Sequence, residues 1–127
     1  MIARFVHIHL EFLQKNPNLI KLFLREIHSN NPIVHKVLKE LYADAESEYF
    51  KGALTKFRKA IKEGQLRPVD PMQTLWNLVG LDLFYFVARP VLNIVWHDKI
   101  QDEAKILRQR EKSIVDLLLY GLLPRNE

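Results

Sequence analysis

The stretch 110-REKSIVDLLLYGLLPRNE-127 decides the fold of this chain. It reads as a helix of about three turns on which apolar residues leave almost no polar face. Those residues are Ile114, Val115, Leu117, Leu118, Leu119, Leu122 and Leu123. A helix with one apolar stripe buries it against its own core, whereas a helix that is apolar nearly all round needs cover on a second side. The sequence must therefore explain what supplies that second cover.

Length and composition limit the possible classes of protein. The 127 residues fit one domain, residues 1–127, which is large enough to bury a core without disulfides. Cysteine is absent, which suits a reducing compartment, so we expect a cytoplasmic protein. The net charge of +4 is mild and by itself indicates no particular partner.

The most apolar run, 75-LWNLVGLDLFYFVA-88, raises the question of a membrane span. It covers 14 residues and contains Asn77 and Asp82. A transmembrane helix needs about 20 mostly apolar residues. We therefore expect a buried helix and no membrane partner. The N-terminus lacks an uninterrupted apolar core of the signal-peptide type, because His7, His9 and Glu11 divide it.

Three dipeptides predict where helices begin: Asn16-Pro17, Asn31-Pro32 and Asp70-Pro71. In each, a side-chain oxygen stands at the N-cap position and proline stands at the first helical position, where its missing N–H is not needed. Gly64 predicts the end of the helix that begins at Pro32. Pro90 is expected to break or kink the helix that begins at Pro71.

Apolar residues at steps of three and four complete the prediction of an all-α fold. We expect about six helices, since a short helix should follow Pro90 at an angle and Asp98 with Gln101 looks like a capping pair for the last one. The expected ranges are about 2–14, from 17, 32–63, 71–89, the piece 91-VLNIVWH-97, and about 99–122. The lysines and arginines of 32–63 alternate with acidic residues, which indicates a solvated face rather than a nucleic-acid surface.

Metal binding and catalysis have no clear candidates. His7 and His9 are two residues apart on a helix and point to nearly opposite sides, so they cannot chelate one ion. The sequence shows no phosphate-binding loop, nucleophile elbow or HExxH motif. We therefore predict no metal, no cofactor and no enzymatic activity.

Polar residues inside the apolar helix 71–89 leave two readings open. Asn77, Asp82 and Arg89 are costly to bury unless they are paired. They could form structural hydrogen bonds or interface pairs, or one of them could orient a ligand in an apolar pocket. Tyrosines and tryptophan among the aromatic residues would suit such a pocket, although most aromatic residues must be core.

The two strongly apolar helices answer the question of cover. In a domain of about six helices, 71–89 and the last helix can hardly both be central within one subunit. The economical arrangement packs both against the same helices of a second copy, as a four-helix bundle about a two-fold axis. Gly80 and Gly121 would allow close approach there. The predicted interface comprises Leu78, Leu81, Tyr85, Ile114, Leu117, Leu118 and Gly121.

At this point the chain resembles a known family. The succession of "FLQKNP", "NLIKLFLREI", "VDP", "FVARPVL" and "RQREKSIVDLLLYGLLP" is similar to the C-terminal effector-binding and dimerisation domain of TetR-type transcriptional regulators. The resemblance covers essentially the whole chain. It implies a homodimer through a four-helix bundle and a pocket for a small hydrophobic effector, enclosed by the earlier helices.

The resemblance also implies a DNA-binding head that residues 1–127 do not contain. In the family, a helix-turn-helix unit precedes this domain, and an effector shifts the connecting helix, here Ile2 to Gln14, so that two recognition helices no longer match sites about 34 Å apart. We expect either a fragment of a longer regulator or a stand-alone domain. For these residues alone we expect no sequence-specific DNA binding.

The leading functional hypothesis is thus the sensing and dimerisation half of a transcriptional repressor that binds an apolar or aromatic molecule. The alternative is a helical oligomerisation module without a ligand. Inward stripes of the second, third and fourth helices suggest the pocket residues Phe23, Ile27, Leu41, Tyr49, Trp76, Val79 and Leu83. The sequence does not identify the effector, the operator or the regulated genes, or whether the regulator represses or activates.

Overall fold

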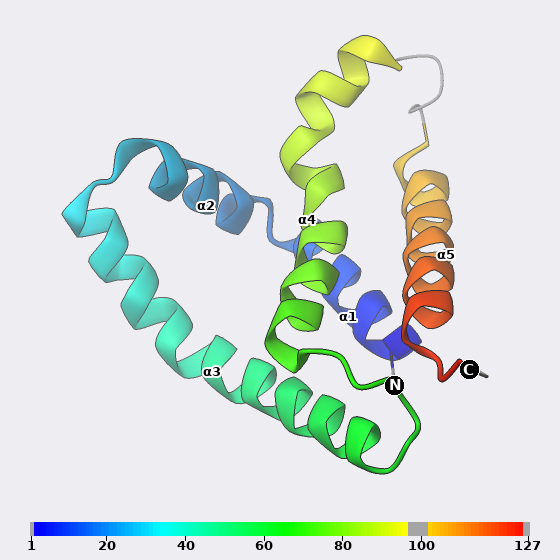
Figure 1. Cartoon of the computed structure of the whole chain (residues 1–127). Coiled ribbons are helices and arrows are strands. Elements are labelled where there is room, and N and C mark those ends of the chain that lie inside the picture. Colours follow the sequence, from blue (N-terminus) through cyan, green and yellow to red (C-terminus); the bar gives the residue numbers. More distant parts are fainter. Residues whose placement is uncertain (1, 97–101, 126–127) are drawn as a thin grey trace. The chain divides into compact units, whose positions relative to one another are not determined.

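The computed structural model describes residues 2–96 and 102–125, apart from the side chains at 34, 37, 38 and 41–50. Every regular element in this described part is an α-helix, so the all-α prediction is confirmed (Figure 1). The helices are α1 (Ile2–Lys15), α2 (Pro17–Ser29), α3 (Pro32–Lys62), α4 (Pro71–Val95) and α5 (Glu103–Leu122).

The three predicted helix starts are confirmed, and two of them use the expected N-cap. Asp70 Oδ1 accepts hydrogen bonds from the backbone N–H groups of Met72 and Gln73 at 2.9 and 3.1 Å. Asn31 Oδ1 accepts one from Ile33 at 2.9 Å. Asn16 differs, because its side-chain amide donates to the Phe12 carbonyl at 2.8 Å and thereby caps the end of α1.

Pro90 lies inside α4, which continues to Val95. The prediction of a separate sixth helix after Pro90 is therefore wrong, and the described residues form five helices. A proline removes one backbone hydrogen bond and crowds one turn, which costs a helix about 3 kcal/mol but does not force it to end. The apolar residues on both sides of Pro90 keep the helical spacing, so α4 is continued through it.

The start of the last helix also differs from the expectation. Asp98 and Gln101, the predicted capping pair, lie outside the described residues. α5 begins only at Glu103. Its cap is Asp102, whose Oδ1 accepts the Lys105 N–H at 3.2 Å, while the Asp102 carbonyl accepts the Ile106 N–H at 3.0 Å.

The turn after α3 uses a left-handed residue, as the sequence predicted. Gly64 has φ +75°, and its N–H donates to the Ile61 carbonyl at 3.1 Å.

We expect Gly64→Ala to lower the free energy of unfolding by about 1 kcal/mol, because a Cβ is strained at positive φ. Gly52→Ala is the matched control: Gly52 lies within α3 with open space around its Cα, so alanine should raise the unfolding free energy by about 0.5–1 kcal/mol. Urea unfolding measures both, and a stabilising Gly64→Ala would contradict this assignment.

The chain divides into two compact units. The first contains the residues up to Ile20 together with Trp76–Gly121, and so holds α1, most of α4 and nearly all of α5. The second contains Lys21–Leu75 and the residues from Leu122 onward. The prediction of a single domain stays a prediction.

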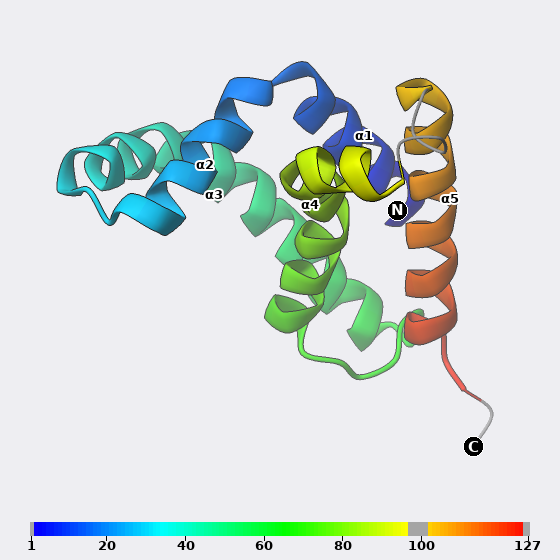
Figure 2. The ribbon, with the colours of Figure 1, turned by 90° about the horizontal axis from the view of Figure 1, so that it is seen from above.

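Within the first unit, α4 and α5 run antiparallel and α1 lies beside both (Figures 1 and 2). Two contacts set the pairing of α4 with α5: Arg89 Nη1 with Glu103 Oε2 at 3.0 Å, and Arg110 Nη2 with the Leu81 carbonyl at 3.0 Å. Each helix buries apolar residues at steps of three and four. The buried set is Ile2, Val6, Leu10, Leu13, Leu78, Tyr85, Phe86, Leu107, Ile114 and Leu118.

In the second unit, α2 and α3 are joined at Asn30, whose φ is +49°, and by a hydrogen bond between His35 Nδ1 and Glu26 Oε1 at 2.8 Å. The segment after α3 is tied down where the Arg67 N–H donates to the Leu122 carbonyl at 2.8 Å. Its buried apolar residues include Ala53, Phe57, Ala60, Leu66 and Leu75.

Candidate functional site

One side of α4 is apolar and uncovered. Trp76 is 60% exposed, Phe84 58% and Val91 60%, although all three are large apolar side chains. They recur at helical spacing, so they share one stripe along the helix. By length and composition α4 could cross a membrane, and only 22% of its most apolar 18-residue window is buried. The single chain therefore buries this helix only in part, and the expectation of a buried helix stays a prediction.

The last helix also has an uncovered apolar edge. Leu117 is 62% exposed and Tyr120 is 78% exposed, whereas Ile114 and Leu118 are buried. Gly80 in α4 is exposed as well, and a Cβ built there would meet no atom within 4 Å. We name the exposed set Trp76, Phe84, Val91, Leu117 and Tyr120 the uncovered face.

The predicted interface residues fall into two groups. Four of them are already covered by the chain itself, namely Leu78, Tyr85, Ile114 and Leu118. A covered side chain gains almost no further burial when a second copy docks. It would therefore position the exposed interface residues without contacting the second copy itself. Leu81 and Gly121 are partly exposed, and Leu117 is largely exposed.

Sequence reasoning missed Phe84, Val91 and Tyr120 as surface residues, and it placed Trp76 in the pocket. The sequence did not reveal which side of each helix faces the interior of its unit. On α4, Asp82 and its neighbours at steps of three and four mark the inner side, and the stripe through Phe84 lies on the other side. The interface assignment itself stays a prediction.

The predicted pocket residues are divided between the two units. Trp76, Val79 and Leu83 belong to the first unit, and the others to the second. Phe23 and Ile27 are exposed, and Val79 and Leu83 are partly exposed. The side chains of Leu41 and Tyr49 lie outside the described ones. That these seven residues form one pocket stays a prediction.

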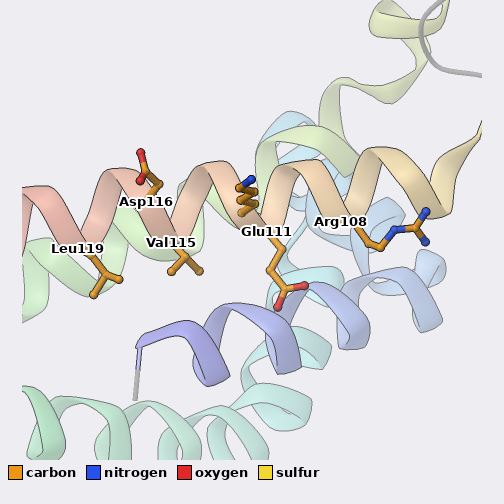
Figure 3. Close-up of a pocket in the computed structure, with 6 residues that line it drawn as sticks. Arg108, Glu111, Val115, Asp116 and Leu119 are labelled. Atoms are coloured by element: carbon orange, nitrogen blue, oxygen red, sulfur yellow. The ribbon is translucent and has the colours of Figure 1, made fainter.

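A groove of about 390 Å³ runs along α5 (Figure 3), and Leu117 does not line it. Val115 and Leu119 make its apolar part, and Glu111 points toward α1 (Figure 3). The remaining lining residues are Arg108, Lys112 and Asp116. None of the predicted pocket residues lines this groove, which is open and edged by charges of both signs.

A buried polar contact joins α1 to α4. His9 Nδ1 and Asp82 Oδ2 are 2.7 Å apart, and the Asp82 side chain has no exposed surface. Burial raises the pKa of the Asp82 carboxyl, although the hydrogen bond from His9 opposes the rise. The second oxygen, Oδ1, has no hydrogen-bond partner among the described residues. The structural reading of Asp82 as a paired residue is thereby confirmed.

Arg89 is likewise paired rather than free. Besides its contact with Glu103, its guanidinium lies 5.8 and 5.6 Å from the ring centroids of Tyr85 and Phe86. Burial raises the pKa of the Tyr85 hydroxyl, and the nearby Glu103 adds to that rise. This cluster fixes the α4–α5 pairing at the end where the two helices are connected. Asn77, the third polar residue singled out in α4, is exposed.

His7 and His9 lie on different sides of α1, as their spacing predicted. His7 is exposed and bonds Glu111 at 2.9 Å, whereas His9 faces the opposite way into the buried contact. Within residues 2–96 and 102–125, no three side chains of His, Cys, Asp or Glu are placed to hold a metal ion.

Comparison with known families shows what the chain is similar to. The family described as the C-terminal region of YcdC-like proteins, a TetR-type C-terminal family, matches residues 1–125. None of the curated proteins compared with the chain matches it.

Proposed function

The chain belongs to the family of YcdC-like C-terminal regions, and on that premise we propose that it is the effector-sensing and dimerisation domain of a TetR-type transcriptional repressor. Such C-terminal domains are parts of transcription regulators, which are generally not enzymes. In this proposal the chain forms a homodimer and binds an apolar or aromatic small molecule. DNA binding belongs to a helix-turn-helix head outside these residues.

The uncovered face is the observation that carries the proposal. The five large apolar side chains of this face are each more than half exposed in the single chain. An apolar patch of this kind on a soluble protein marks an interaction surface. A second copy of the same chain would offer the same two helices, so α4 and α5 would pack on their counterparts as a four-helix bundle.

A second copy suits this face better than lipid does. The stripe on α4 includes the exposed Asn77 and Gly80, and on α5 the exposed Ser113 is one helical turn from Leu117. Exposed polar groups of this kind are expensive in a hydrocarbon environment but are common at protein interfaces. The glycine would allow two helices to approach closely.

The effector pocket is supported less directly, by the family and by the aromatic and apolar residues predicted to line it. The alternative, a ligand-free oligomerisation module, would have a fully packed interior. A sensor should show a higher melting temperature in the presence of hydrophobic probe compounds, because binding to the native state stabilises it. A packed module should not respond to the same compounds.

The first test is a native mass spectrum of the purified chain. We expect a species at twice 15.0 kDa, with additional mass if an effector is retained. A dimer without additional mass would support the interface. The melting experiment would then decide whether the chain binds an effector. A monomer that needs no detergent would contradict the dimer, and recovery only with detergent would indicate that lipid covers α4 instead.

A further inference from the structure

We propose that the His9–Asp82 pair is a proton-dependent contact that fixes α1 on α4, so that α1 detaches more readily as pH rises. The contact itself follows from the structure alone. Its regulatory meaning rests on the proposed function, in which α1 connects this domain to the DNA-binding head.

The pair is built unlike the other contacts of α1. His9 and Asp82 meet at 2.7 Å, and their side chains are 10% and 0% exposed. The second described side-chain bond from α1 to another helix, His7 to Glu111, has partners that are 59% and 30% exposed. Exposed histidine–carboxylate pairs contribute little because water screens them. The buried pair therefore dominates the polar attachment of α1.

The charges around the pair come from α5 and from α1 itself. From α5, Arg110 favours the charged form of Asp82 and Glu111 disfavours it. The guanidinium of Arg110 is already engaged, since Nη2 donates to the Leu81 carbonyl. On α1 itself, His7 and Glu11 are exposed and the Phe5 ring lies 5.8 Å from the His9 ring. No described side chain donates to Asp82 Oδ1, so His9 is the direct partner of this carboxyl.

Proton counting gives the direction of the effect. With one shared proton beyond the neutral imidazole and the carboxylate, the pair has no net charge, whether the proton sits on nitrogen or on oxygen. Loss of that proton leaves one negative charge on a buried pair, which is costly. When α1 is detached, both groups are solvated and the charge costs little.

The raised pKa of the Asp82 carboxyl predicts the same direction of the pH effect. A group whose pKa is higher in the attached state stabilises that state below its ordinary pKa, and the stabilisation is lost as pH rises through the raised value. Both considerations predict that detachment of α1 is favoured as pH rises. A difference of one proton changes the detachment equilibrium by up to about tenfold per pH unit.

The absence of cysteine from the chain makes the test direct. Leu13, buried on α1, is replaced by cysteine, so that a thiol reagent reacts only when α1 detaches. Gln14→Cys, at the neighbouring exposed position, is the reference. The ratio of the two reaction rates removes the pH dependence of the thiol and measures detachment. It is recorded from pH 4 to 8.5, because the raised pKa of Asp82 departs from an ordinary value of 3.8, without DNA or effector and with the oligomeric state checked at each pH.

We expect the ratio to rise several-fold with pH, and Asp82→Asn to abolish this rise, because the amide keeps the shape and a hydrogen bond but holds no shared proton. His7→Gln is the matched control and should leave the rise intact. A flat ratio in the parent chain would overturn the proposal. So would a rise that persists in Asp82→Asn, or one that equals the change in global unfolding measured by urea. None of these results depends on the dimer or the effector, so the two proposals fail separately.

Discussion

Replacing Leu117 with glutamate is expected to raise the dissociation constant of the dimer at least about a hundredfold, so that monomer or aggregate replaces the dimer at micromolar concentrations. Leu117 is 62% exposed in the single chain, so the folded subunit can accept the carboxylate in water. In the bundle the same carboxylate would be buried without a partner. Sedimentation equilibrium measures the constant, and circular dichroism checks that the subunit stays helical.

Lys112→Gln is the matched control for this variant. It changes the net charge by the same amount, and Lys112 is an exposed residue of the same helix. It lies about 140° around α5 from Leu117, on the side of the groove, so the dimer should be unaffected. A Leu117→Glu chain that sediments as a normal dimer would remove Leu117 from the interface and with it the proposed use of the uncovered face.

Local chemistry made the helix boundaries predictable. Asn31 and Asp70 act as N-caps because their short side chains reach the free N–H groups of the next turn, and this depends on two or three residues only. The start of α5 was misplaced because such local capping signals can occur twice within a few residues. Asp98 and Asp102 both offer a capping oxygen, and nothing local separates them, whereas the structure uses Asp102.

The sequence predicted that certain polar residues need partners in other helices, but not which residues those partners are. The sequence indicated that Asp82 and Arg89 needed partners, but the partners are 73 and 14 residues away. No partner was predicted for His9, because that partner is in another helix. The phase of α4 was missed because this helix is apolar on nearly every side, so the pattern does not reveal which side the chain covers.

Breaking the His9–Asp82 pair from one side is expected to destabilise the chain strongly. His9→Leu leaves the Asp82 carboxylate buried without its donor, at a cost of about 3–5 kcal/mol in the free energy of unfolding. Asp82→Leu leaves the His9 ring nitrogen without an acceptor, at a smaller cost of about 1–3 kcal/mol. Urea unfolding at fixed protein concentration measures both.

The double variant, His9→Leu with Asp82→Leu, is expected to unfold within about 1 kcal/mol of the parent chain, because an apolar pair removes the cost of burying both polar groups. Additive losses would contradict this and would show that the two residues act independently. A recovered stability would mean that α1 can be held on α4 by apolar contacts alone. What an apolar pair cannot do is bind a proton, so the double variant should also lose the pH dependence of α1 detachment. Stability and pH response would then be separate properties of one contact, the first replaceable and the second specific to histidine and aspartate.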